Sequence, residues 1–155
     1  MIVAPWHMIL VLRAAVDLSA DGGPAARGLA LRGALVLLIL ADSHEEARIA
    51  LNIARQESHF DPWARNDTCD EGGSPLVCCG VGQAAVHHPS ACGPLGAILV
   101  WSWATELDIL RRSARSCRPT WERALTTYVS GRCGLAVDVA RARCERVGLC
   151  GALVP

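Results

Sequence analysis

Eight cysteines, all in the C-terminal part of the chain, constrain this fold more than any other feature of its 155-residue sequence. They are Cys69, Cys78, Cys79, Cys92, Cys117, Cys133, Cys144 and Cys150. An even number of cysteines in short, loop-rich spacing is typical of disulfides, which form in an oxidising compartment. We therefore expect disulfide-stapled loops and an extracytoplasmic location, either periplasmic or secreted.

Two other interpretations of the cysteines remain open from the sequence. A zinc site usually needs close ligand pairs such as Cys-x-x-Cys, and the chain contains none. Cys78 and Cys79 are too close to chelate one ion easily, although His87 and His88 lie near Cys92. Buried free thiols are the third interpretation, because cysteine packs well as a small apolar side chain. We expect disulfides, with no metal ion and no cofactor.

The overall composition fits one folded domain and gives no support for a nucleic-acid partner. Apolar residues make up 52% of the chain and charged residues 19%, which excludes a disordered chain. Fifteen arginines, with no lysine, balance fifteen acidic residues, so the formal net charge is zero and the pI is near 6.9. A nucleic-acid-binding domain usually has a basic excess, which this chain lacks.

The N-terminal segment contains an apolar run at residues 33–41, preceded by Arg27 and Arg32. This pattern resembles the hydrophobic region of a signal peptide, although a long segment precedes it. An equally good interpretation is that residues 29–41 form the first helix of the domain. The run is too short for a transmembrane helix, so we expect no stable membrane span. We expect an N-terminal extension over residues 1–41 and a domain over residues 42–155.

The remaining chain is predicted to be mainly helical. Ser43 and Glu46 form a capping box that begins a helix over residues 43–58, and Pro62 prevents its continuation. Residues 61–93 are rich in glycine and cysteine, which predicts a loop region. Further helices, marked by prolines at their starts and glycines at their ends, are expected at 94–115, 119–129 and 135–147. No segment alternates between apolar and polar residues, so at most a very small hairpin is expected.

Glu57 is the first candidate for a functional side chain. On a helical wheel, residues 45–58 form one apolar arc, and Glu57 falls between Ala50 and Ile53 in the middle of that arc. A carboxyl group desolvated in this way keeps its proton to higher pH and can act as a general acid. The other interpretation is a structural ion pair with Arg55, Arg65 or another arginine. The helical pattern does not separate the two.

The residues around Glu57 carry a family resemblance. The segment ARQESHFDPWA, residues 54–64, resembles the catalytic motif of lysozyme-like lytic transglycosylases, in which a Glu-Ser pair precedes x-Phe-x-Pro-x-Ala. The matching residues, all in register, are Glu57, Ser58, Phe60, Pro62 and Ala64. Five matches in one short segment make this motif the most specific part of the resemblance.

Two later family elements follow in the family order, each with one departure. Gly80-Val-Gly-Gln83 resembles the element Gly-[apolar]-Met-Gln, with Gly82 in place of the methionine. Thr127-Tyr-Val-Ser-Gly131 resembles the element Ala-Tyr-Asn-x-Gly, with Val129 in place of the asparagine. Loss of the thioether and of the amide indicates a divergent member, an altered substrate or a weakened enzyme.

The resemblance implies a lysozyme-like helical domain with a groove for peptidoglycan glycan strands. Glu57 would act as general acid on the β-1,4 bond between N-acetylmuramic acid and N-acetylglucosamine. It would then act as base on the muramic 6-hydroxyl, which attacks the anomeric carbon and gives a 1,6-anhydro sugar. Ser58, Gln83 and Tyr128 would contact the substrate, and Tyr128 would donate a hydrogen bond to Glu57 or to the sugar.

Three other functions compete with lytic transglycosylation. A hydrolase would need a second carboxylate near Glu57. The candidates near it in sequence are Asp61, Asp67, Asp70 and Glu71. A non-catalytic glycan-binding module would keep the groove, but an arginine would hold Glu57. A zinc-binding Cys/His module would bind the metal stoichiometrically and show free thiols without it.

Overall fold

The computed structural model describes residues 4–66, 76–86, 92–93 and 98–155. Within these residues the chain forms six α-helices, a 3-10 helix at Ala20–Gly22 and one small sheet. The helices are α1 (Pro5–Leu18), α2 (Gly23–Leu40), α3 (His44–Ser58), α4 (Ile98–Ser116), α5 (Trp121–Ser130) and α6 (Val137–Glu145). The prediction of a mainly α chain with disulfide-bonded loops is confirmed.

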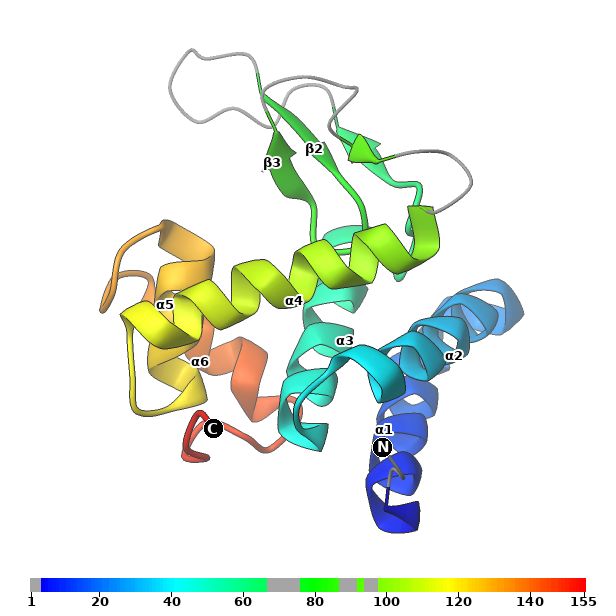
Figure 1. The fold of residues 1–155 in the computed structure, drawn as a ribbon, viewed down its shortest axis with the longest axis horizontal. Helices are drawn as coiled ribbons and strands as arrows, with labels where there is room; N and C mark the ends of the chain where they lie inside the picture. Colours follow the sequence, from blue (N-terminus) through cyan, green and yellow to red (C-terminus); the bar gives the residue numbers. More distant parts are fainter. Residues whose placement is uncertain (1–3, 67–75, 87–91, 94–97) are drawn as a thin grey trace.

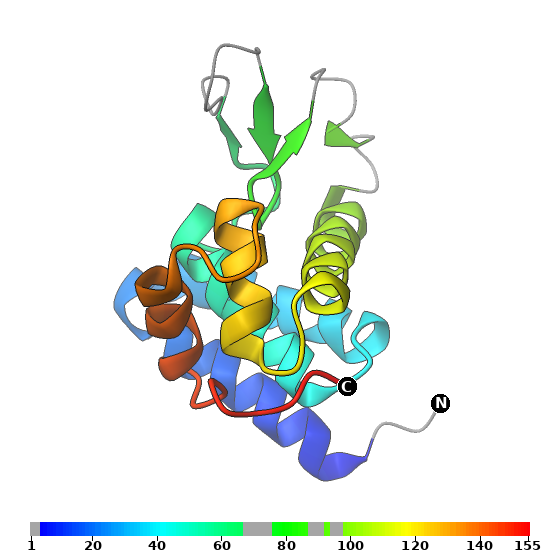
Figure 2. The same ribbon diagram turned by 90° about the vertical axis from the view of Figure 1, so that its left-hand side faces the viewer.

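The sheet forms a lobe at one end of the molecule, above α4 and α5 (Figures 1 and 2). Its antiparallel strands are β1 (Arg65–Asn66), β2 (Val77–Cys79) and β3 (Ala84–Val86), in the order β1-β2-β3. The sequence predicted mostly loop here, with at most a small hairpin. All three residues of β2 are buried, so the strand lacks the alternation that would have revealed it.

Helix α3 begins as the capping box predicts. The Ser43 hydroxyl accepts a hydrogen bond from the Glu46 backbone N–H at 3.1 Å, which satisfies one of the free donors of the first turn. The helix ends at His59, which has a left-handed φ of 56°, and Phe60 follows with a φ of 68°. The chain therefore leaves the helix before it reaches Pro62. Phe60 then turns into the core, where it is buried.

Helices α1 and α2 contribute to the same hydrophobic core as the later helices. Ala30, Ala34 and Leu37 of α2 are fully buried, and a side chain at Gly33 would overlap the indole of Trp103 on α4. Residues 20–40 form a helix whose length and composition alone would allow a membrane span. A buried core helix and a signal sequence share those properties. The expected boundary at residue 41 stays a prediction.

A buried ion pair joins α3 to α4. The Glu46 carboxylate accepts two hydrogen bonds from the Arg111 guanidinium, from Nε at 2.7 Å and from Nη2 at 2.9 Å. Arg111 Nη2 also donates to the Leu40 carbonyl at 2.8 Å. Glu46 is only 3% exposed, and the two-point contact satisfies both of its oxygens. The contact orients α3, which carries Glu57 at its other end.

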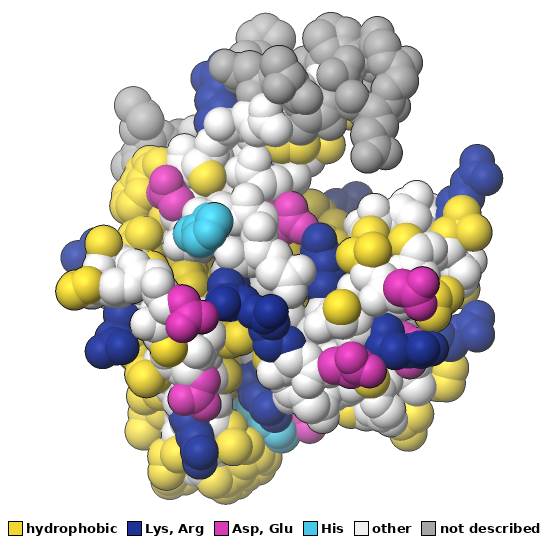
Figure 3. Space-filling model, turned by 180° about the vertical axis from the view of Figure 1, so that it is seen from behind, with side chains coloured by type: hydrophobic (Ala, Val, Ile, Leu, Met, Phe, Trp, Pro, Cys, Tyr) yellow, Lys and Arg dark blue, Asp and Glu magenta, His cyan; other side chains and the backbone are white. Residues whose placement is uncertain are grey.

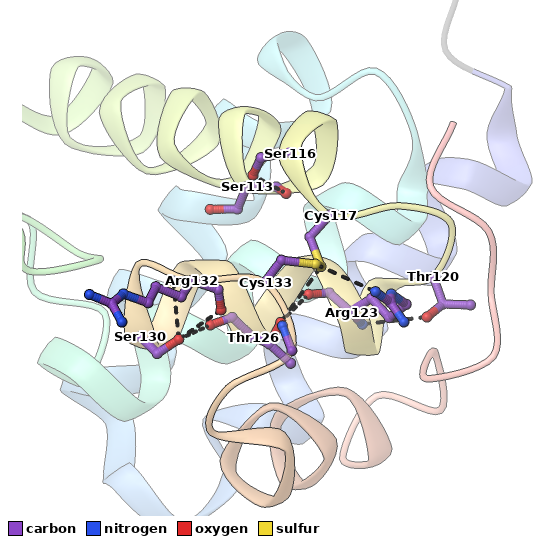
Figure 4. The surroundings of a disulfide bond; sticks show 10 residues. Ser113, Ser116, Cys117, Thr120, Arg123, Thr126, Ser130, Arg132 and Cys133 are labelled. Atoms are coloured by element: carbon purple, nitrogen blue, oxygen red, sulfur yellow. Dashed lines mark hydrogen bonds between the residues drawn. A yellow bond between two sulfur atoms is a disulfide. The ribbon is translucent and has the colours of Figure 1, made fainter.

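Three disulfides join described residues, and each ties a loop or a helix end. Cys79 of β2 bonds Cys92. Cys117, just beyond α4, bonds Cys133, just beyond α5. Figure 4 shows the second bond beside Thr126, whose hydroxyl accepts a hydrogen bond from the Gly134 N–H at 2.7 Å.

The third described bond pins the C-terminal part of the chain. It joins Cys144 of α6 to Cys150, six residues further along the chain. Cys78 is disulfide-bonded as well. Because disulfides persist in oxidising surroundings, these bonds indicate an oxidising compartment outside the cytoplasm.

Candidate functional site

A cleft of about 600 Å³ lies between the sheet lobe and the helices below it. Its walls come from the end of α3, from the strands, and from α4, α5 and α6. The residues that matter for its chemistry are Glu57, Gly82, Gln83, Tyr128, Val129 and Arg143. Figure 3 shows this side of the molecule hollowed below the lobe, with acidic and basic side chains next to each other in the hollow.

Glu57 lies in the last turn of α3 and is held by an arginine. Its Oε1 accepts a hydrogen bond from Arg143 Nη2 at 2.5 Å. The side chains of Glu57 and Arg143 are 27% and 14% exposed, so the pair is half-buried in the cleft wall. The ion pair that the sequence left open is therefore present, with an arginine 86 residues away. This contact links the end of α3 to α6 across the cleft wall.

The backbone of α6 at Arg143 is held by two contacts. The side-chain amide of Asn52 on α3 donates to the Arg143 carbonyl at 2.5 Å, and Asn52 itself is buried. The next residue, Cys144, is held by its disulfide to Cys150. Arg143 Nε and Nη1 are buried with no hydrogen-bond partner among the described residues. Glu57 is thus the side chain that the Arg143 guanidinium contacts in this part of the structure.

Tyr128 of α5 makes two hydrogen-bond contacts, one with α4 and one with the turn before β3. Its hydroxyl lies 2.8 Å from Glu106 Oε2 and 3.1 Å from the Gly82 carbonyl oxygen. The resemblance predicted a hydrogen bond to Glu57 or to the substrate. Among the described residues, the phenol instead joins α4 to the turn before β3, which carries Gln83.

Glu106 is a second carboxyl group close to Glu57. It lies on α4, is 1% exposed, and faces Tyr128, Glu57 and Arg143. The pKa of Glu106 is raised to about 8, mainly by burial. The negative charge of Glu57 contributes to the rise, and the Tyr128 hydrogen bond and the charge of Arg143 oppose it. Burial likewise raises the pKa of Tyr128 well above its ordinary value. Glu106 is therefore mainly a neutral acid at neutral pH.

The absence of a side chain at Gly82 is explained by Glu106. A Cβ at position 82 would overlap Glu106 Oε2 and would lie 2.9 Å from the Tyr128 hydroxyl. The space that a side chain at position 82 would need is thus occupied by a carboxyl from α4. Gly82 therefore leaves no gap in the cleft wall, because Glu106 fills the space beside it.

Gln83 and Ser58 hold the turn that contains Gly82. Gln83 lines the cleft, and its side-chain amide donates to the Gly80 carbonyl at 3.0 Å. The Ser58 hydroxyl lies 2.9 Å from the Val81 carbonyl and 3.1 Å from that of Ala54, so it bonds backbone and lies outside the cleft lining. Direct substrate contacts by Ser58 and Gln83 stay predictions.

Sequence reasoning missed both Glu106 and Arg143. Glu106 lies between Trp103 and Leu110 on the buried face of α4, so the helical-wheel argument used for Glu57 would have found it. Arg143 carried no local signal. Of the expected second carboxylates, Asp61 accepts a hydrogen bond from the Trp63 N–H at 2.9 Å and does not line the cleft. The others, Asp67, Asp70 and Glu71, lie outside the described residues.

No cluster of three or more His, Cys, Asp or Glu side chains suited to a metal ion occurs among the described residues. Cys79 and Cys92, two of the thiols considered for zinc, bond each other as a disulfide. His87 and His88 lie outside the described residues. A thiolate site built on Cys79 and Cys92 would therefore require reduction of this bond.

Comparison with protein-family models, with curated proteins and with solved structures finds no match for this chain. The likeness to lytic transglycosylases thus depends on the motif residues themselves.

Proposed function

We propose that this protein is a peptidoglycan-cleaving enzyme of the lytic transglycosylase type, with Glu57 as its catalytic group. The supporting observation is that Glu57, Gln83 and Tyr128, which belong to three separate motifs, line one cleft. A cleft lined by the Glu57 carboxyl and the Gln83 amide suits a polar glycan strand. The oxidising compartment indicated by the disulfides, periplasmic or secreted, is where such a substrate occurs.

In this proposal Glu57 is used twice. As an acid it gives its proton to the glycosidic oxygen while the bond to the anomeric carbon of N-acetylmuramic acid breaks. As a carboxylate it then takes the proton of the muramic 6-hydroxyl, whose oxygen forms the new bond to the same carbon. The proton returns to Glu57, no water is consumed, and the second product is a 1,6-anhydro sugar.

The ion pair with Arg143 determines how the cycle begins. Arg143 holds Glu57 Oε1 at 2.5 Å, so the carboxyl is engaged in an ion pair in this structure. A glycan strand must displace Arg143 before the Glu57 carboxyl can reach the glycosidic oxygen.

A non-catalytic glycan-binding module is the second candidate, and the same ion pair favours it. Such a module was expected to keep the groove and to have Glu57 held by an arginine, and Arg143 makes that contact. In that case Glu57 and Arg143 would be structural, and the cleft would bind glycan strands without cleaving them.

The test is to incubate the oxidised protein with purified peptidoglycan and to analyse the soluble products by mass spectrometry. Anhydro-muropeptides are the expected result. Muropeptides heavier by one water would indicate a hydrolase. Co-sedimentation with peptidoglycan but no soluble product would favour the binding module. The absence of both binding and soluble product would overturn both candidates.

A further inference from the structure

Among the described residues, Glu106 is the buried carboxyl near the cleft that the proposed cycle does not use. It does not line the cleft, so it cannot touch a substrate directly. Its contacts are with Tyr128 and with the space beside Gly82. We propose that Glu106 is a positioning residue which, as a neutral acid, donates a hydrogen bond to the Tyr128 hydroxyl oxygen and thereby ties Tyr128 to the turn that carries Gln83.

Counting hydrogens supports this assignment. The Tyr128 hydroxyl has one proton but lies within hydrogen-bond distance of two acceptors, Glu106 Oε2 at 2.8 Å and the Gly82 carbonyl at 3.1 Å. The carbonyl can only accept. If Glu106 is neutral, its O–H donates to the Tyr128 oxygen and the Tyr128 O–H donates to Gly82, so both bonds are complete. If Glu106 is ionised, one proton serves two acceptors and the Gly82 bond is lost.

The surroundings of Glu106 also favour the neutral form. Glu106 Oε1 is buried with no hydrogen-bond partner among the described residues, and an ionised oxygen in that position is strongly disfavoured. The charged groups that face it are Glu57 of α3 and Arg143 of α6, which largely offset each other as an ion pair. Tyr128 of α5 is the titratable hydroxyl in contact. A pKa of about 8 for Glu106 agrees with this arrangement.

The consequence is a hydrogen bond between two walls of the cleft that depends on the protonation of Glu106. Tyr128 belongs to the helical wall and Gly82 to the sheet lobe. The turn at Gly82 positions Gln83, whose backbone N–H donates to the Gly80 carbonyl at 3.2 Å. Ionisation of Glu106 turns the Tyr128 proton away from Gly82 and removes one of the bonds that hold the turn, while the bonds of Ser58 and Ser102 to Val81 remain. The affinity for glycan should fall about fivefold when this bond is lost, an expectation that rests on the proposed function.

The hydrogen-bond switch can be measured without any substrate. Tyr128 is the single tyrosine of the chain, so ring-labelled tyrosine gives one NMR signal. The carbon that bears the hydroxyl should shift in a single step near pH 8, while the phenol itself remains protonated. In Glu106→Gln, whose neutral amide donates to Tyr128 at every pH, the step should disappear. No step in the wild type, or a step that persists in Glu106→Gln, would overturn the inference.

If Glu106→Gln does not fold, carboxyl-labelled glutamate in the wild-type protein provides the second measurement. One glutamate signal must then titrate together with the Tyr128 signal, and titration of all glutamates in the ordinary acidic range overturns the inference. Binding of peptidoglycan fragments between pH 6 and pH 9 tests the consequence. Affinity should fall about fivefold across pH 8 in the wild type and stay flat in Glu106→Gln. Absence of binding at every pH contradicts the proposed function and leaves the NMR result to decide the role of Glu106.

Discussion

The carboxyl group of Glu106 occupies the space that a side chain at residue 82 would need. The two residues lie on different elements, Glu106 on α4 and Gly82 in the turn before β3, and Tyr128 bonds both. This relationship explains why a glycine stands at a position where the resembling family has a methionine. It also places a buried acid directly behind the cleft wall.

Gly82→Ala should therefore destabilise the protein. The new Cβ would overlap Glu106 Oε2, and the forced shift should lower the free energy of unfolding by about 1–3 kcal/mol. Urea unfolding measures the loss. The double variant Gly82→Ala/Glu106→Ala removes the overlap, so its loss should be smaller than the sum of the two single losses. Additive losses would show that the two side chains do not compete for one space.

The stability of the fold should fall as the pH rises through the range in which Glu106 titrates. Its pKa is about 8 in the folded protein against an ordinary value of 4.5, so the folded state holds a proton that the unfolded state has released. The stabilisation is complete below pH 4.5, declines as the pH rises from 4.5 to 8, and is lost above pH 8.

Urea unfolding at several pH values, with Glu106→Gln as the reference, measures this decline. Because all other groups titrate in both proteins, the difference between them isolates Glu106. The wild type should lose stability relative to Glu106→Gln from pH 5 to pH 8. A constant difference across this range would mean that Glu106 ionises normally in the folded protein.

Arg143→Gln should separate the two candidate functions. The ion pair is partly exposed, so its loss should lower the free energy of unfolding by only about 1 kcal/mol. If Glu57 is the catalytic group, removing the guanidinium that occupies its carboxyl should increase peptidoglycan cleavage several-fold. Arg146→Gln, an exposed arginine near the same helix that does not line the cleft, is the matched control. A folded Arg143→Gln protein with no cleavage favours the binding module.

The two described C-terminal disulfides should contribute unequally to stability. Cys117 and Cys133 close a loop with a sequence separation of 16, whereas Cys144 and Cys150 are separated by 6. In the chain-entropy model, replacing each pair by serines should lower the free energy of unfolding by about 3 and about 2 kcal/mol. Urea unfolding of the two double variants measures the order. A larger loss for the Cys144/Cys150 pair would indicate that this bond also holds α6 in place.

Much of the helical fold could be predicted because its signals are local. The Ser43 cap, the glycine stop at Gly131 and the apolar periodicity placed α3 and α5 within a few residues of their observed ends. The sheet could not be predicted, since its strands have two or three residues and β2 is buried on both faces. Strands this short depend on tertiary packing and on the Cys79–Cys92 bond, which spacing alone does not reveal.

The candidate site was predictable where a motif carried it. Glu57, Gln83 and Tyr128 were named from three motifs that resemble those of lytic transglycosylases, and they lie at one cleft. Their partners were not named, because the contacts cross long stretches of chain: Glu57 to Arg143 spans 86 residues and Glu106 to Tyr128 spans 22. A buried acid on α4 was visible in the helical pattern, but its meaning depended on the contact between its carboxyl and the turn at Gly82.

Catalysis of glycan-strand cleavage by Glu57 is tested most directly by product analysis with Glu57→Gln. Purified peptidoglycan would be incubated with wild type, with Glu57→Gln and with the control Glu145→Gln, which changes an exposed glutamate of α6. Mass spectrometry should show anhydro-muropeptides from wild type and from Glu145→Gln, and none from Glu57→Gln that has kept its fold by circular dichroism. Equal release of products by Glu57→Gln and wild type would contradict the claim.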